Sequence, residues 1–290
     1  MNNPTLRAPL RPTRFLTLLA TAIGVAAGGR ARAEIIAADG RNVPPSSEAP
    51  MGELAVRRGV QGPEGLFTAR INLLVNATKG RFGEPVSLAP DLYYAFSDTF
   101  QLGLVHTSPM GWQTVPPVSL CLSGQRHGCA HVYDNVALDV MYGLLYGDVH
   151  LSLHTALYFP KLSDPIWPLW TVGLSGKVHF TKDVALFFDP QIGITLAHRS
   201  LYKDRLYIPV ALQIQATTLL SIDVLTGIEG QLSALGDSNR APLGLGLVGN
   251  VNRHLDLGLR FSFDNLLGHQ VTGLSRTDVR SLGFLVTIRS

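Results

Sequence analysis

The chain has 290 residues, of which 46% are hydrophobic and only 16% are charged, and its mean hydropathy is +0.19. Charged residues usually make up about a quarter of a soluble domain, so this composition is unusually poor in charge. The formal net charge of +3 is too small to indicate a partner made of nucleic acid, and we expect none.

The N-terminus has the features of a secretory signal peptide. Several arginines precede an apolar stretch at residues 15–27, and the small residues that end at Ala33 have the spacing of a cleavage site. We therefore predict a signal peptide over residues 1–33. An N-terminal anchor helix is the alternative, but the apolar run is too short to span a bilayer. Residues 34–64 are rich in Pro, Gly, Ser and charge without periodicity, which predicts a flexible leader.

Alternation of apolar and polar residues begins at residue 66 and recurs about twelve times. In residues 148–159, for example, Val149 and Leu151 share one parity whereas His150 and Ser152 share the other. Successive side chains of a strand point to opposite faces, so each such segment has one apolar and one polar face. We predict strands at residues 66–76, 86–97, 99–107, 132–146, 148–160, 169–181, 183–198, 205–217, 219–230, 242–252, 254–264 and 279–289.

The connections between the predicted strands alternate in length. Very tight turns alternate with longer links, at residues 77–85, 108–131, 161–168, 199–204, 231–241 and 265–278. Short turns at one end and longer loops at the other are typical of an antiparallel transmembrane barrel. The only two cysteines, Cys121 and Cys129, lie in one of the long links. In an exported chain these spacings favour a local disulfide, and a metal site that includes the nearby histidines is the alternative.

The apolar parity is almost free of charge. It includes Phe67 in the first strand and Phe284 in the last, and the charged residues that share it are Asp134 and Arg280. Beyond the N-terminus, no apolar run approaches the roughly 18 residues that a spanning helix needs. A charge-free face therefore predicts strands that contact lipid. The alternative is a soluble all-β sandwich, whose solvent face would normally carry many Lys and Glu residues.

Residues 66–289 resemble a Gram-negative outer-membrane β-barrel, porin-like in its general plan. The resemblance implies an all-β fold, a closed antiparallel transmembrane barrel of about twelve strands that forms one domain at residues 65–290. It also implies periplasmic turns, a periplasmic leader, external loops, and a place in the bacterial outer membrane among lipid and lipopolysaccharide. Assembly machinery of the outer membrane inserts such barrels, and many end on an aromatic residue where this chain ends Ile288-Arg289-Ser290. No cofactor and no metal are expected.

The polar parity collects the residues that we predict to line the lumen. They are Arg70, Asp91, Tyr93, Asp139, His150, Ser152, His154, Lys177, His179, Asp189, Asp223, Glu229, Asp256, Arg260 and Asp264. Acidic residues outnumber Lys and Arg by seven to three in this set. Barrels of eight strands are filled and barrels of sixteen hold an aqueous channel, so twelve strands are intermediate.

We therefore expect a narrow passive channel for small hydrophilic solutes, with a mixed-charge, net acidic lumen. Two alternatives remain open at this stage. In the first, the interior is a plug of mutual salt bridges without conduction. In the second, the barrel is a membrane-anchored interaction or structural protein that presents its external loops to a partner.

A third possibility is a lipid-directed hydrolase. If the turn after Tyr146 is a two-residue hairpin, Asp139 faces His154, and Ser152 lies on the same wall. Carboxylate, imidazole and hydroxyl are the groups of a nucleophilic triad. The His-x-Ser pattern resembles that of outer-membrane phospholipase A, but the Asn-Gly that follows it in that family is absent here. In that family these residues also face lipid, where the substrate lies, whereas the residues of this wall are on the polar parity. We therefore favour polar lining over catalysis for this wall and expect no enzyme.

Overall fold

The computed structural model describes residues 54–110, 119–123, 129, 131–269 and 275–290. The predicted signal peptide and residues 34–53 of the predicted leader lie outside these ranges. Helical structure in the described part is limited to three short elements, η1 (Ala55–Arg57), η2 (Leu232–Ala234) and α2 (Leu235–Ser238). None of the described helices has the length and apolar character needed to cross a membrane.

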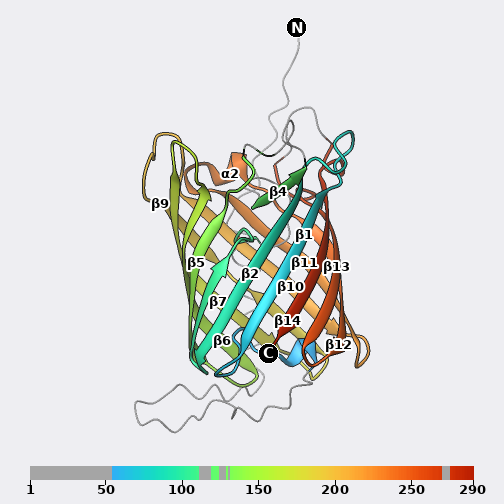
Figure 1. Ribbon diagram of the computed structural model, residues 1–290. Helices are drawn as coiled ribbons and strands as arrows, with labels where there is room; N and C mark the ends of the chain where they lie inside the picture. The colour runs from blue at the N-terminus through green and yellow to red at the C-terminus, as the bar shows by residue number, and fades with distance from the viewer. Residues whose placement is uncertain (1–53, 111–118, 124–128, 130, 270–274) are drawn as a thin grey trace. The chain divides into compact units, whose positions relative to one another are not determined.

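The strands form one antiparallel sheet that closes into a barrel (Figure 1). They are β1 (Phe67–Asn76), β2 (Val86–Ser97), β3 (Phe100–Val105), β4 (Leu120–Ser123), β5 (Val136–Leu145), β6 (Val149–Lys161), β7 (Trp167–His179), β8 (Val184–Phe188), β9 (Gln191–Thr195), β10 (Arg205–Gln215), β11 (Leu220–Gln231), β12 (Leu243–Asn252), β13 (Leu255–Phe263) and β14 (Arg280–Arg289). Neighbours in sequence are mostly neighbours in space, and β1 pairs with both β2 and β14, which leaves the barrel without a free edge.

The prediction of a closed barrel of twelve strands is confirmed. Strand β4 is a short addition within the predicted loop 108–131, where it pairs with the end of β2. Strands β8 and β9 are the two halves of the single strand predicted at residues 183–198, and each half pairs with both β7 and β10.

Proline explains the interruption between β8 and β9. Pro190 has no N–H to donate to a ladder, so the strand bulges at Asp189-Pro190. The bulge is held on both sides, because the N–H of Leu174 donates to the Pro190 carbonyl at 3.1 Å and the N–H of Asp189 donates to Pro209 at 3.1 Å. It places the Asp189 side chain in contact with His154 in the interior.

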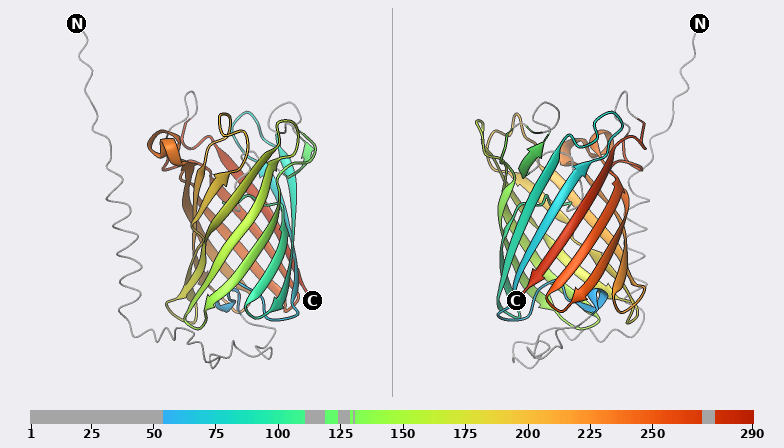
Figure 2. Two further views of the ribbon diagram at one scale, coloured as in Figure 1. Left: turned by 90° about the vertical axis from the view of Figure 1, so that its left-hand side faces the viewer. Right: turned by 45° about the vertical axis from the view of Figure 1, so that its right-hand side comes forward.

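The two ends of the barrel differ, as the alternating connections predicted. The tight turns lie at one end together with the C-terminus, and the long connections lie at the other end (Figure 2). We call these the turn end and the loop end. Since the turns are those expected on the periplasmic side, the turn end is the periplasmic one.

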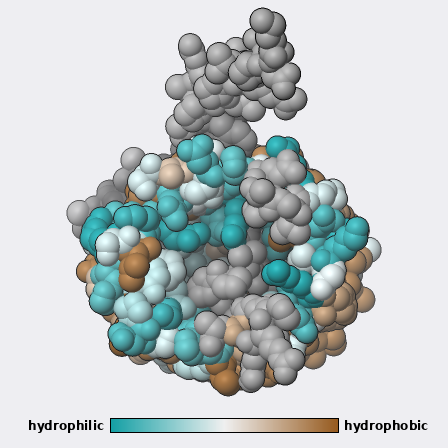
Figure 3. Space-filling view, turned by 90° about the horizontal axis from the view of Figure 1, so that it is seen from above, coloured by the Kyte–Doolittle hydropathy of each residue, from teal (hydrophilic) through white to brown (hydrophobic). Residues whose placement is uncertain are grey.

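Large apolar side chains cover the outside of the wall. Leu245, Leu138 and Phe284 are 58%, 52% and 44% exposed, whereas the small or polar neighbours beside them in sequence are buried. Seen from the loop end, hydrophilic residues form the rim and hydrophobic residues lie on the flanks (Figure 3). Asp134, which we predicted on the apolar parity, does not lie on this outer face. Asp134 precedes β5 and is buried, where it accepts a hydrogen bond from the N–H of Leu162 at 2.8 Å, so the prediction that it faces outward is wrong.

Candidate functional site in the barrel interior

The inward face of the strands carries polar and charged side chains, most of them buried. Ten of the residues that we predicted to line the lumen are buried, namely Asp91, Asp139, Ser152, His154, Lys177, Asp189, Asp223, Glu229, Asp256 and Asp264. The other five, Arg70, Tyr93, His150, His179 and Arg260, are half-buried. Ten of the fifteen residues fall into three groups, which lie at the middle of the wall, at the loop end and at the turn end.

The middle group is centred on His154, which lies between two carboxylates. Its Nε2 is 2.5 Å from Asp139 Oδ2, and its Nδ1 is 2.9 Å from Asp189 Oδ1. The amide of Gln191 completes the cluster, 3.0 Å from the same Nδ1. Both ring nitrogens thus face carboxylate oxygens, so the ring can donate to both carboxylates only in its protonated form.

This geometry corrects the predicted hairpin register. Asp139 pairs across the strands with Ala156, and Met141 pairs with His154. The turn is longer than two residues, since Leu145 pairs with Leu151, and a bulge between Gly143 and Leu145 then shifts the ladder by one residue. Asp139 therefore reaches His154 diagonally along the same face. A diagonal contact is within reach of long side chains in an antiparallel pair.

The cluster does not form a nucleophilic triad. Ser152 is buried on the same face of β6, opposite Gly143 on one side and Ser175 on the other. A general base for Ser152 needs a ring nitrogen free to accept its proton. Both nitrogens of His154 are engaged with Asp139 and Asp189 instead. The arrangement of Ser152, His154 and Asp139 is thus a charge cluster with a neighbouring serine.

An apolar layer lies in the interior toward the loop end. It consists of Met110 and of inward-facing residues from six strands, namely Val105, Ala137, Ala156, Tyr158, Leu169, Tyr207, Ala211 and Leu225. These strands are β3, β5, β6, β7, β10 and β11. Tyr93 packs against this layer. Met110 belongs to the loop after β3 and is fully buried. Its Cε lies 3.0 Å from the position that a Cβ on Gly227 would occupy. Since β3 and β11 lie on opposite sides of the ring of strands, residues 106–110 reach across the interior.

Three carboxylates near the loop end have local partners. Asp91 accepts hydrogen bonds from the N–H groups of His106 and Thr107 at 2.7 and 3.0 Å, which fixes the start of the loop that carries Met110. Glu229 lies 3.5 Å from Arg240 and 4.0 Å from Arg205.

The third of these carboxylates, Asp264, follows the end of β13. It accepts hydrogen bonds from the hydroxyl groups of Ser262, at 2.6 Å, and Ser281. Burial raises the pKa of Asp264 to about 7, although both hydrogen bonds act in the opposite direction.

The group at the turn end contacts the chain that precedes β1. Asp256 binds Arg58, Lys177 donates to the carbonyl oxygens of Ala55 and Arg58, and His179 contacts the carbonyl oxygen of Val56. We expected a flexible leader as far as residue 64. The structure instead places residues 54–64 against the inner side of the turn end.

These contacts change the expected charge of the interior. Four arginines outside the predicted set reach its carboxylates: Arg58 and Arg289 contact Asp256, and Arg205 and Arg240 contact Glu229. These four arginines equal in number the excess of acidic over basic residues in the predicted set. The expected net acidic lumen is therefore not supported. Arg58 lies in the predicted leader, so parity gave no signal for it, whereas Arg289 closes the last predicted strand.

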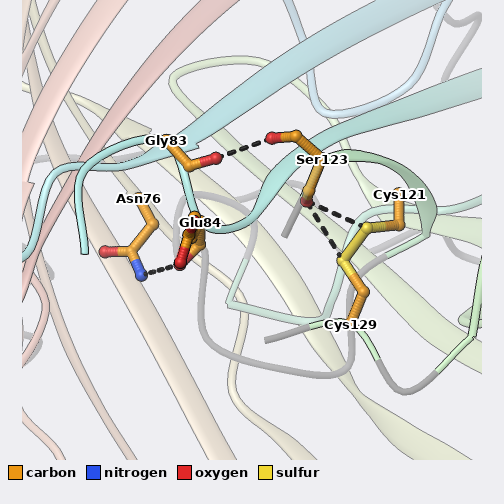
Figure 4. The surroundings of a disulfide bond; sticks show 6 residues. All are labelled: Asn76, Gly83, Glu84, Cys121, Ser123 and Cys129. Atoms are coloured by element: carbon orange, nitrogen blue, oxygen red, sulfur yellow. Dashed lines mark hydrogen bonds between the residues drawn. A yellow bond between two sulfur atoms is a disulfide. The ribbon is translucent and has the colours of Figure 1, made fainter. Parts of the chain in front are cut away.

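The predicted disulfide is confirmed at the loop end. Cys121 and Cys129 are joined, and the carbonyl oxygen of Ser123 lies against both sulfur atoms (Figure 4). The Ser123 hydroxyl donates to the carbonyl oxygen of Gly83 at 2.6 Å, which ties β4 to the connection between β1 and β2. The disulfide therefore fastens a loop to the rim and takes no part in the interior.

Comparison with known proteins gives similarities of structure only. No protein-family model matches the chain. No curated protein matches it either. Among solved structures, the NanC porin has a TM-score of 0.49 at 7% sequence identity, over 77% of this chain and 98% of that chain. The KdgM porin, in complex with disordered oligogalacturonate, has 0.47 at 7% identity, over 77% and 97%. The outer membrane protein Omp33 of Acinetobacter baumannii has 0.40 at 11% identity, over 79% and 100%.

At these identities the similarity concerns the barrel fold alone. Within the chain itself, a closed antiparallel barrel with an apolar outer belt satisfies every requirement of strands that cross a bilayer. The chain is a transmembrane β-barrel of the kind found in the bacterial outer membrane.

Proposed function

We propose that the barrel is a narrow passive channel for small hydrophilic solutes. The observation that carries this proposal is a set of inward-facing polar side chains that keep solvent-accessible surface. Arg70, Tyr93, His150, His179 and Arg260 are only half-buried, although they point away from the lipid-facing belt. They come from β1, β2, β6, β7 and β13, so the accessible polar surface is distributed around the interior. Polar side chains on an inward face with room beside them are the lining that an aqueous path needs.

The same wall supports a limit on solute size. Twelve strands enclose less space than the sixteen of an open porin. The apolar layer around Met110 takes up part of that space toward the loop end. A solute must therefore be small, and it passes aromatic and aliphatic side chains as well as charged ones.

The balance of charge supports weak selectivity between cations and anions. Carboxylates of the interior are paired with arginines, as in Asp256–Arg289 and Glu229–Arg240. Paired charges of opposite sign partly cancel, so electrostatic focusing of one ion type is weak.

The proposal also includes the route into the membrane. Lipid and lipopolysaccharide are the expected surroundings of the apolar belt, and outer-membrane assembly machinery is the expected means of insertion. In the last strand, Phe284 is the aromatic residue exposed on the lipid face.

A liposome-swelling assay tests the proposed channel. Folded protein is incorporated into vesicles, and these are diluted into isotonic solutions of neutral solutes of increasing size, from glycerol to a disaccharide. The proposed function predicts swelling that is fastest for the smallest solute and falls steeply with size. Vesicles that contain correctly folded protein and yet do not swell in any solute contradict it. Vesicles with heat-denatured protein serve as the control for leakage.

A further inference from the structure

The chain before β1 crosses the turn end of the barrel in contact with every hairpin there. Residues 54–64, which we call the N-terminal segment, include η1 at the base of the barrel (Figures 1 and 2). The backbone N–H of Glu64 and the side chain of Gln61 bind the β2–β3 turn, at Asp98 and Thr99.

Contacts with the other four hairpins complete the ring. Gly59 lies against His150 of β6, since a Cβ on this glycine would be 3.1 Å from the imidazole Nδ1. Arg57 Nε donates to the carbonyl oxygen of Lys182 in the β7–β8 turn at 3.3 Å. Gln215 of β10 accepts from the N–H of Val56 at 3.3 Å, and Arg58 binds Asp256 of β13. A segment that touches all five hairpins spans the opening that they surround.

The barrel wall supplies a built receptor for this segment. Arg58 binds both oxygens of Asp256, at 2.6 and 3.3 Å, and Asp256 is almost fully buried. A two-point contact between guanidinium and carboxylate fixes orientation as well as distance. Lys177, which is also buried, donates from Nζ to the carbonyl oxygens of Ala55 at 3.1 Å and Arg58 at 3.0 Å. A buried lysine that binds backbone carbonyls recognises a particular path of the chain.

The attachment is nevertheless shallow, which suits a part that moves. Val56 is the one residue of the N-terminal segment with a buried side chain. The remaining contacts are polar, and the Arg58 side chain is 25% exposed. Polar contacts can be replaced by contacts with water when the segment leaves, whereas Met110 is anchored among apolar side chains.

We propose that the N-terminal segment is a tethered plug that closes the periplasmic mouth of the pore, and that the Arg58–Asp256 pair is its latch. This inference rests on the proposed function, since a plug regulates only a barrel that conducts. When the Arg58–Asp256 contact breaks, the segment leaves the mouth but stays attached to β1, and the path is open to solute.

The test combines a measure of docking with a separate measure of conduction, both in the full chain. Docking is followed by the reaction of a Val56→Cys variant with a membrane-impermeant maleimide. The thiol is shielded while the segment is docked, and the native cysteines are paired. The latch is cut by Arg58→Gln, and Arg81→Gln, which changes an exposed arginine at the loop end, is the matched control.

We expect Arg58→Gln to speed the labelling of Cys at position 56, and to raise the mean conductance in planar bilayers, each by about five- to tenfold. We expect Arg81→Gln to change neither. A reversible lock comes from the double variant Gly59→Cys/His150→Cys. Oxidation should lower its conductance and dithiothreitol should restore it, whereas dithiothreitol should leave the conductance of the wild type unchanged.

The possible failures are distinguishable. Fast labelling at position 56 with the latch intact shows that the segment does not dock, which overturns the plug. Faster labelling in Arg58→Gln without a rise in conductance, when the wild type conducts, shows that the docked segment does not block the pore. That outcome overturns the plug and leaves the channel standing. If no variant conducts, including those with fast labelling, the proposed function fails and the plug fails with it.

Discussion

Replacement of His154 should destabilise the barrel strongly. His154 lies between Asp139 and Asp189, and the three side chains are only 6%, 3% and 9% exposed. In His154→Gln, the amide can donate to one carboxylate while its oxygen faces the other. Two buried carboxylates then lose the imidazole between them, and with it the positive charge that a protonated ring carries. Removal of one partner from a buried ion pair costs roughly 3–5 kcal/mol, and because we expect water in the lumen we place the loss at about 3 kcal/mol.

The assay is reversible unfolding by urea in lipid vesicles. Tryptophan fluorescence and the heat-dependent shift on SDS gels both report the folded fraction. Ser152→Ala, on the same face of β6, is the matched control, with an expected loss below about 1 kcal/mol. Adding Asp189→Asn to His154→Gln should recover about half of the loss, because it removes one of the two unpaired charges. A free energy of unfolding for His154→Gln within about 0.5 kcal/mol of the wild type would refute the charge cluster.

Three further changes test other parts of the interior and the rim. Met110→Gly removes the side chain that reaches Gly227, so single-channel conductance should rise about twofold. An unchanged conductance would mean that the Met110 side chain does not limit the passage of ions. Replacement of Cys121 and Cys129 by Ser removes a loop closure that stabilises local order by roughly 2–3 kcal/mol. Protease should therefore cut the β4 region faster, while the barrel keeps its gel shift. Equal cleavage rates would argue against this anchoring. The pKa of Asp264 is raised from 3.8 to about 7. The free energy of unfolding should therefore be highest below pH 4 and should fall by up to about 4 kcal/mol as the pH rises to 7. Asp264→Asn should abolish this fall, and a parallel fall in the variant would exclude Asp264 as its source.

Much of the fold could be predicted because lipid imposes a simple rule on the outer face. Each of the twelve strands keeps apolar residues on one parity, and the connections alternate in length, so strand number and orientation follow from the sequence alone. The proline at position 190 was the local exception. A proline within an alternating run is compatible with an edge, a bulge or an end, and only the paired neighbours Leu174 and Pro209 show that it is a bulge.

The interior was less predictable, because its contacts depend on register and on partners far apart in sequence. The bulge between Gly143 and Leu145 shifts the β5–β6 ladder, and no turn signal in the sequence gives its position. Arg58 and Asp256 are separated by 198 positions, and Arg58 lies in a stretch without periodicity. Parity identified the wall residues, whereas the balance of charge depended on arginines that parity could not assign.

Single-channel recording in planar bilayers tests the central claim most directly. Protein whose folding has been verified by its gel shift is inserted into a bilayer of low background conductance. The account predicts small, discrete and ohmic current steps with a reversal potential close to zero in a salt gradient, and larger or more frequent steps in Arg58→Gln. Bilayers that stay sealed with both the folded wild type and the folded Arg58→Gln variant would contradict a conducting lumen.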